Sequence, residues 1–152
     1  MRRIDPLACL SAVLFIGLLA APAEAGFVTP TSQPFTQQLS CTIPTTPASS
    51  CATAGVTTPS GMTVAIENVT FRCNASAPVS VGFVTATTSG TAHVYNFAST
   101  DAPDPTGRIN SVSSNPTVIW LTPPSSINAT FLFTAAVSPG ASCIMTVSGE
   151  QF

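Results

Sequence analysis

The stretch "GMTVAIENVTFRC", residues 61–73, carries two alternating apolar patterns that are out of step with each other. Apolar residues occupy even positions up to Ile66 and odd positions from Val69 onward. Alternation of this kind indicates a strand with one buried face. Because an extra residue in one strand shifts the parity, we predict a β-bulge at Glu67 and Asn68 that turns both side chains toward water. The alternative is that the bulge presents Glu67 in a cleft, as a ligand-binding or acid–base group.

The rest of the chain breaks into short segments of the same kind, separated by proline, glycine, serine and asparagine clusters. The segments are rich in valine, threonine and phenylalanine, and none keeps the i, i+3, i+4, i+7 pattern of a helix. We therefore predict an all-β domain, an antiparallel β-sandwich of the jelly-roll or immunoglobulin-like type. Hairpin turns are expected at residues 89–90 and 139–140. The seven predicted strands cover residues 35–41, 62–73, 79–87, 92–98, 117–122, 127–137 and 142–148.

Residues 1–25 have the pattern of a secretory signal peptide. Arg2 and Arg3 precede an apolar run over residues 7–20, and an A-x-A cleavage site ends at Ala25. The apolar run is shorter than a helix that spans a bilayer. We therefore expect a single domain over residues 26–152 that is secreted or periplasmic and is not inserted into the membrane.

Charged side chains are scarce, with four arginines, six acidic residues and no lysine in the whole chain. After residue 25 the cations are Arg72 and Arg108 alone. A phosphate backbone needs clustered cations to displace its counterions, so nucleic acid and anionic lipid are not expected as partners.

Four cysteines follow the signal peptide: Cys41, Cys51, Cys73 and Cys143. An even number in an exported domain predicts two disulfides. Cys73 and Cys143 each share the parity of the apolar residues in their own strand, so both should point into one core. This favours Cys73 with Cys143 and Cys41 with Cys51, and pairing of Cys41 with Cys73 is the alternative. No zinc site is expected, because there is no C-x-x-C pair and only one histidine.

Catalytic residues are not expected either. His93, Asp101 and Asp104 formally supply the histidine and aspartate of a triad, but no G-x-S-x-G motif accompanies them. The two aspartates lie in "TDAPDPTGR" (residues 100–108), whose prolines and glycine predict turns, with a calcium site as the alternative. Sequons of the form N-x-[ST] lie at Asn68, Asn74 and Asn128. About two are expected by chance in so Ser/Thr-rich a chain, so these sequons do not predict glycosylation.

Aromatic residues provide a different binding hypothesis. Trp120 lies in "TVIWLT", and Tyr95 and Phe97 share one strand face. In carbohydrate-binding sandwiches exposed rings stack on sugars, so these three residues and Glu67 are the candidate binding residues. The alternative, which we favour for Trp120, is a core residue that anchors one sheet against the other.

Two resemblances support the fold. The segments "PSGMTVAIENVTFRC" and "FTAAVSPGASCIMTVSGEQF" resemble a pattern in small exported bacterial proteins without an assigned activity, which implies a β-sandwich. The spacing from Gly140 to Phe152, with Cys41 and Cys73 as a disulfide candidate, is similar to that of chaperone-usher pilus subunits. That resemblance implies an incomplete sandwich completed by a neighbour's strand. The polar residues at alternate positions before Phe152 differ from the apolar ones of those subunits.

We therefore expect a non-enzymatic exported protein with a structural or surface-interaction role and no cofactor. Its partner is unknown, with a glycan or another exported protein as the candidates. The alternatives are a carbohydrate-binding module and a pilus-like subunit that assembles by strand donation through residues 27–39.

Overall fold

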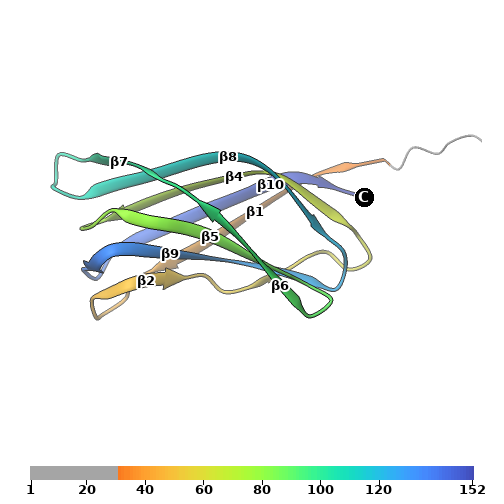
Figure 1. Ribbon diagram of the computed structural model, residues 1–152, viewed down its shortest axis with the longest axis horizontal. Coiled ribbons are helices and arrows are strands. Elements are labelled where there is room, and N and C mark those ends of the chain that lie inside the picture. Colours follow the sequence, from red (N-terminus) through yellow and green to blue (C-terminus); the bar gives the residue numbers. More distant parts are fainter. Residues whose placement is uncertain (1–30) are drawn as a thin grey trace, which may run out of the picture.

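In the computed structural model, which describes residues 31–152, the chain forms two antiparallel five-stranded sheets packed face to face (Figure 1). The described residues contain strands and no helix, which confirms the predicted all-β class. None of them belongs to a helix long and apolar enough to cross a membrane. The predicted signal peptide, with Cys9, lies outside the described residues. The strands are β1 (Gln33–Thr42), β2 (Ala48–Ala52), β3 (Val56–Thr57), β4 (Val64–Ala75), β5 (Val79–Thr88), β6 (Thr91–Phe97), β7 (Thr100–Pro103), β8 (Ile109–Leu121), β9 (Ser125–Val137) and β10 (Ser142–Gln151).

The strand order is that of a jelly roll. Sheet A has the order β1-β10-β4-β8-β7, and sheet B has the order β2-β9-β5-β6 with β3 also paired to β9. The two halves of the chain thus pair antiparallel along their length, like a long hairpin. In this arrangement β1 pairs with β10, β2 and β3 with β9, β4 with β8, and β5 with β6. Rolling this doubled ribbon up produces the two sheets of a jelly roll. Of the two sandwich types predicted, the structure therefore has the jelly roll.

All seven predicted strands are present, but the sequence patterns missed three short ones and half of β8. β2, β3 and β7 contain only one buried residue between them, Cys51, so they lack the apolar alternation that predicts a strand. β8 begins at Ile109 and not at residue 117, because its first half, "INSVSSNP", is polar. Its inward position there is taken by Ser111, which is buried and accepts a hydrogen bond from the Val79 backbone N–H at 3.1 Å.

One of the two predicted hairpins is confirmed. Ser89 and Gly90 both have positive φ, as a tight turn between β5 and β6 requires. The second turn forms around Gly140, which has φ of 84° and whose neighbour Ala141 donates to the Ser138 carbonyl at 3.3 Å. It is not a hairpin, however, because β9 and β10 lie in opposite sheets.

The predicted bulge in β4 is confirmed. Ser148 of β10 lies opposite Asn68, and the next residue, Gly149, lies opposite Ile66, so Glu67 is the extra residue. Glu67 is exposed and Asn68 is half-buried, whereas Ile66 and the apolar residues on both sides of the bulge are buried. A single added residue therefore lets both halves of β4 face the same core.

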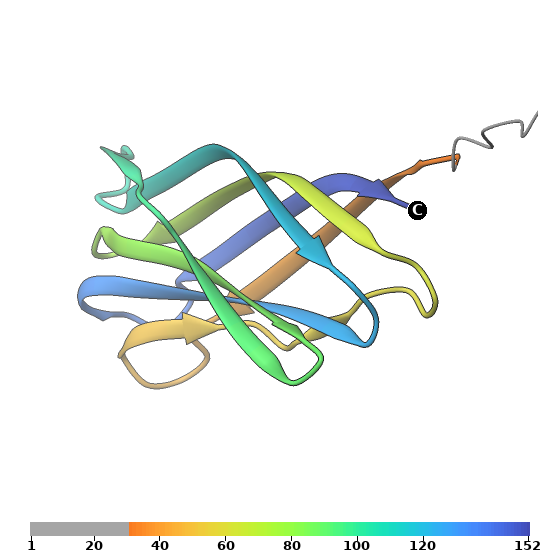
Figure 2. The ribbon, with the colours of Figure 1, turned by 45° about the vertical axis from the view of Figure 1, so that its right-hand side comes forward.

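The core fills the space between the two sheets, which cross over each other in Figure 2. At its centre the rings of Phe71 from sheet A and Phe131 from sheet B meet edge to face, with centroids 5.4 Å apart. Phe35 and Leu39 of β1 are also buried in this core. Residues 33–39 of the segment expected as a donor strand therefore form part of β1 in their own molecule, and residues 27–30 lie outside the described part.

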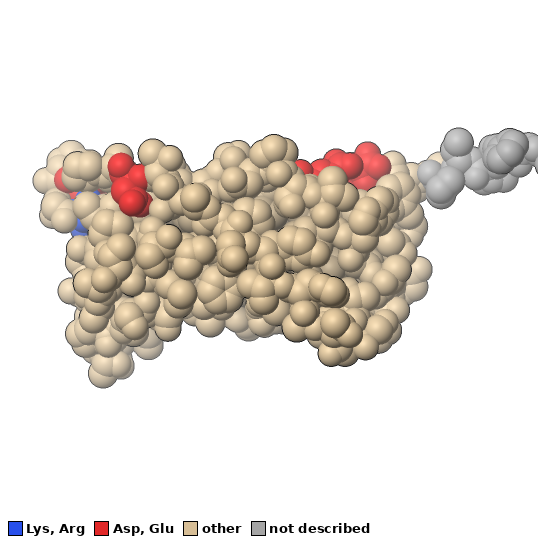
Figure 3. Space-filling view, viewed as in Figure 1, with Lys and Arg blue, Asp and Glu red and all other residues tan. Residues whose placement is uncertain are grey.

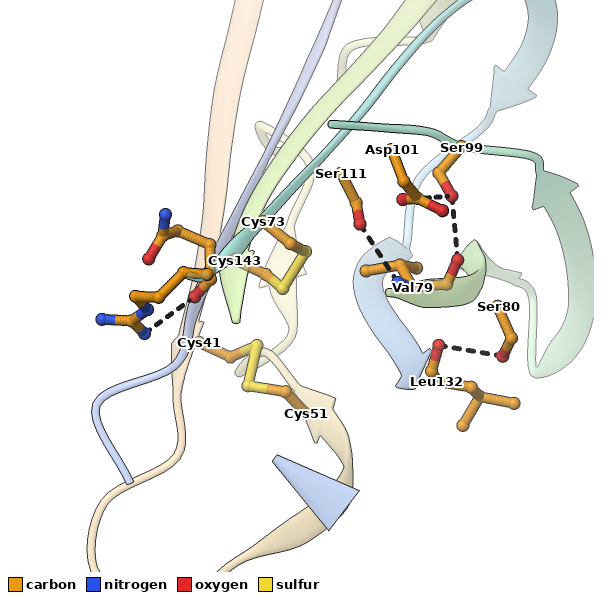
Figure 4. The surroundings of a disulfide bond; sticks show 12 residues. Cys41, Cys51, Cys73, Val79, Ser80, Ser99, Asp101, Ser111, Leu132 and Cys143 are labelled. Carbon is orange, nitrogen blue, oxygen red and sulfur yellow. Dashed lines mark hydrogen bonds between the residues drawn. A yellow bond between two sulfur atoms is a disulfide. The ribbon is translucent and has the colours of Figure 1, made fainter. Parts of the chain in front are cut away.

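Both predicted disulfides are present, Cys41–Cys51 and Cys73–Cys143 (Figure 4). The first joins β1 of sheet A to β2 of sheet B, and the second joins the neighbouring strands β4 and β10 of sheet A. The alternative of Cys41 with Cys73 is wrong, because Cys143 lies between them in the sheet. Two disulfides in so small a domain indicate an oxidising compartment.

Candidate functional site

Trp120 lies on the outer face of sheet A and is 60% exposed. Its ring stacks on that of Phe152, with centroids 6.1 Å apart and planes at 29°. The prediction that Trp120 anchors the core is wrong for a simple reason. Ile119 and Leu121 take the inward positions of β8, and because side chains alternate along a strand, Trp120 must point outward.

The backbone of sheet A fixes both rings. Phe152 donates its N–H to the Thr63 carbonyl at 2.9 Å, and Thr63 donates back to the Phe152 carbonyl at 3.3 Å, so the C-terminal residue continues the pairing of β10 with β4. Trp120 lies opposite Ala65 on the other side of β4. Ala65 has its side chain on the outer face, yet it is buried. A small residue at this central position allows the rings from β8 and the C terminus to meet above β4.

Val118 extends this apolar surface, since it lies two residues before Trp120 on the same face and is exposed. We call Ala65, Val118, Trp120 and Phe152 the aromatic patch. Large exposed apolar residues that adjoin one another are typical of interaction sites, whereas single ones are ordinary.

Two carboxylates flank the aromatic patch. Glu150 of β10 lies opposite Ala65, in the same cross-strand row as Trp120. Glu67 projects from the bulge, two residues beyond Ala65, and is exposed. The space-filling view shows acidic side chains at two places along the sheet A side, one near the C terminus, and the rest of the visible face has almost no charge (Figure 3). The structure does not support the hypothesis that Glu67 lies in a cleft, because its side chain is exposed.

A pocket of about 480 Å³ lies at the same end of the sandwich, where the β3–β4 and β8–β9 loops meet. Thr58 donates its hydroxyl to the Ser125 carbonyl at 3.3 Å, and the Ser125 hydroxyl is shared between Thr88 and the Thr122 carbonyl. Residues 122–124 follow Trp120 in the chain after the buried Leu121, so the pocket begins just beyond the end of β8 that carries Trp120. The pocket is lined by Thr57, Thr58, Ser60, Gly61, Pro123, Pro124 and Ser125.

The other two aromatic candidates do not join Trp120. Phe97 is buried in the core, and Tyr95 is half-buried and packs against it. They share one face of β6, as expected, but that face points inward and β6 belongs to sheet B. The prediction of one binding surface made by Trp120, Tyr95 and Phe97 is therefore wrong. Phe152 and Glu150 take the places beside Trp120, and the sequence signalled them only weakly, because their position depends on the pairing of β10 with β4.

The residues considered for catalysis or metal binding lie on separate elements. His93 is exposed in β6, Asp101 is exposed in β7, and Asp104 lies in the turn before β8. Within residues 31–152 no group of three histidine, cysteine or acidic side chains is close enough together to hold a metal ion.

Asp104 organises its turn, as the sequence predicted. Its Oδ1 accepts hydrogen bonds from the Thr106 hydroxyl at 2.6 Å, the Thr106 N–H at 2.8 Å and the Arg108 N–H at 3.0 Å. These donors, the Thr106 hydroxyl above all, lower the pKa of Asp104. Asn74 of one sequon donates its side-chain amide to Asn110 at 2.8 Å and to Asp104 at 3.2 Å, so this amide is part of the same network.

No protein-family model matches the chain, and no curated protein and no solved structure shows significant similarity to it. A jelly roll hosts many unrelated activities. The function therefore has to be inferred from the aromatic patch itself.

Proposed function

We propose that the protein is an exported, non-enzymatic surface-interaction protein that binds carbohydrate through the aromatic patch. The observation that carries this proposal is the exposure of Trp120 in a stacked pair with Phe152 on an open sheet face. Paired strands hold both residues in place, so little conformational freedom would be lost on binding.

Carbohydrate fits the chemistry of this surface. The C–H faces of a sugar ring are apolar and stack on an indole or phenyl ring, while the hydroxyl groups around the ring are hydrogen-bond donors. Glu67 and Glu150 place acceptors at the edge of the aromatic patch, where such hydroxyls would lie. The same carboxylates would repel phosphate or sulfate groups, so a neutral glycan is the ligand that we propose.

Export is supported by the signal-peptide pattern over residues 1–25 together with the two disulfides. A binding role without catalysis is supported by the separation of His93, Asp101 and Asp104 onto different elements, with Asp104 engaged in its own turn.

Binding to a panel of neutral oligosaccharides and polysaccharides tests the proposal. The chain has a single tryptophan, so its fluorescence reports directly on the aromatic patch. We expect ligand to shift the emission of Trp120 and to protect it from iodide. Replacing a central aromatic anchor costs about 2 kcal/mol or more, so Trp120→Ala should weaken binding by roughly 30-fold.

The matched control is Val94→Ala. Val94 is an equally exposed apolar residue, at 57%, but it lies in β6 of sheet B. This variant should bind like the wild type, and both variants should remain folded because neither side chain is buried. If no neutral glycan bound at millimolar concentration, or if Trp120→Ala bound as well as Val94→Ala, the proposed function would be wrong.

A further inference from the structure

The four disulfide cysteines of the domain are gathered at one place in the core. Cys41 of β1 lies directly opposite Cys143 of β10, and Cys143 lies directly opposite Cys73 of β4. These three residues form one cross-strand row on the inner face of sheet A. Cys51 reaches this row from the facing sheet through its bond to Cys41, and the two disulfides lie side by side in Figure 4.

Cys143 is therefore within bonding reach of two partners. Directly opposed residues in an antiparallel pair have Cα atoms about 4.5 or 5.5 Å apart, and both values fall within the range that a disulfide spans. Cys143 has such a neighbour on each side, Cys73 in β4 and Cys41 in β1. Cys41 and Cys73 are two strands apart, about 9.6 Å, which is too far for a bond.

We propose that the domain has a second disulfide state, in which Cys41 is bonded to Cys143. A dithiol reductant first donates two electrons to Cys41–Cys51 and becomes a disulfide itself, leaving Cys41 and Cys51 as thiols. The Cys41 thiolate then attacks the sulfur of Cys143. The Cys41–Cys143 bond forms, the Cys143–Cys73 bond breaks, and Cys73 leaves as a thiolate that takes up a proton.

The arrangement of the strands favours this exchange. Displacement at sulfur proceeds in line, with the attacking and leaving sulfurs on opposite sides of the sulfur under attack. Because β10 lies between β1 and β4, Cys41 approaches Cys143 from the side opposite to Cys73. The row thus places nucleophile, central sulfur and leaving group in the order that the reaction needs.

Burial determines which disulfide a reductant reaches first. Cys41 and Cys51 are 9% and 5% exposed, whereas Cys73 and Cys143 are 1% and 0% exposed. Cys51 also lies in β2, an edge strand of sheet B. A reductant therefore reaches Cys41–Cys51 first. The exchange then moves the free thiol from Cys41 to the more deeply buried Cys73.

The exchange alters what the disulfides hold together. Cys41–Cys51 joins the two sheets, whereas Cys41–Cys143 joins β1 to β10 within sheet A. The second state therefore releases β2 from its covalent link to sheet A and leaves thiols at Cys51 and Cys73. In the reverse direction the Cys73 thiolate displaces Cys41 from Cys143, and an exchange protein in its disulfide form then oxidises Cys41 and Cys51 and is itself reduced to a dithiol, so the domain carries a reversible redox switch.

Two double variants test the geometry, each in the full chain with Cys9→Ser so that no fifth thiol interferes. Cys51→Ser with Cys73→Ser leaves Cys41 and Cys143, which we expect to form a disulfide almost completely under air oxidation without denaturant. The matched control, Cys51→Ser with Cys143→Ser, leaves Cys41 and Cys73, which should remain thiols. Mass spectrometry after alkylation measures both, and circular dichroism confirms the β-sheet content.

A second measurement uses the wild-type disulfides and does not depend on whether a variant folds. The native protein is treated with limiting dithiothreitol, quenched by acid and alkylation, and mapped by peptide mass spectrometry. We expect Cys41–Cys143 in a measurable share of the molecules that retain one disulfide. If these molecules contained only Cys73–Cys143, or if the control variant oxidised as readily as the first variant, the proposal would be overturned.

Discussion

Gly149→Ala is expected to destabilise the fold strongly, because Gly149 packs against the backbone at the bulge of β4. An added Cβ would overlap the carbonyl oxygen of Ala65, and it would lie 2.9 Å from the carbonyl carbon of Ala65 and 3.0 Å from the backbone nitrogen of Glu67. All three atoms belong to the main chain of β4, which is paired on both sides and has no rotamer to adopt. The strands themselves would have to separate.

The loss of stability expected for Gly149→Ala can be compared with that expected for alanine at two other glycines. Overpacking a core by one methyl group costs about 1–3 kcal/mol when side chains can adjust, so a clash with backbone should reach about 3 kcal/mol or more. At Gly82 a Cβ would lie 2.7 Å from an edge carbon of the Phe71 ring, so a side chain and not the backbone would have to shift, and we expect a cost of about 1–3 kcal/mol. At Gly55 the nearest atom is the Ile127 carbonyl oxygen at 3.9 Å, so alanine should change stability by less than about 1 kcal/mol.

Urea unfolding followed by far-UV circular dichroism measures the series. With an m-value of about 1–3 kcal/mol/M, a loss of 3 kcal/mol lowers the midpoint by about 1–3 M. Glu150 and Phe152 follow Gly149 in the chain and are positioned by the same pairing with β4, so Gly149→Ala should also weaken glycan binding. If the free energies of unfolding of Gly149→Ala and Gly55→Ala agreed within about 0.5 kcal/mol, the close approach at the bulge would be refuted.

Three further predictions concern crosslinks, burial and charge. Replacing Cys73 and Cys143 together by serine should cost about 4 kcal/mol, measured by urea unfolding, because their disulfide closes a loop with a sequence separation of 70; a loss below about 1 kcal/mol would contradict this. Ser111→Ala should lower the free energy of unfolding by about 1–3 kcal/mol in the same assay, because it leaves the buried Val79 N–H without its acceptor. An unchanged midpoint would show that another acceptor is present. The hydrogen bond from the Thr106 hydroxyl and those from the Thr106 and Arg108 N–H groups hold the pKa of Asp104 below its ordinary value. The ionised carboxylate therefore stabilises the folded turn above that ordinary value, and this contribution is lost as pH falls through the lower, folded-state pKa. The stability gap between the wild type and Asp104→Asn should therefore close on acidification, and a gap that stayed constant would count against the hydrogen bonds of the turn.

The parity of apolar residues along single strands predicted much of the structure. The change of step at Glu67 located the bulge, and the shared parity of Cys73 and Cys143 with their apolar neighbours identified the disulfide between them. These predictions succeed because successive side chains in a strand point to opposite faces, which is a property of the local backbone. The same rule missed β2, β3 and β7, which are short, have only one buried residue between them and therefore carry little alternation.

The sequence by itself thus determined the all-β class, the bulge and the favoured pairing of the cysteines. Only the tertiary structure decided the jelly-roll order and the place of Trp120. The parity of a strand shows which residues share a face, but only the packing of the sheets shows which of the two faces is buried in the core. Trp120 was expected in the core and lies outside, whereas Phe97 was a candidate for the surface and lies inside. The aromatic patch joins Trp120 of β8 to Phe152 at the C terminus across Ala65 of β4, and residues so far apart in the chain become neighbours only when the whole sheet has formed.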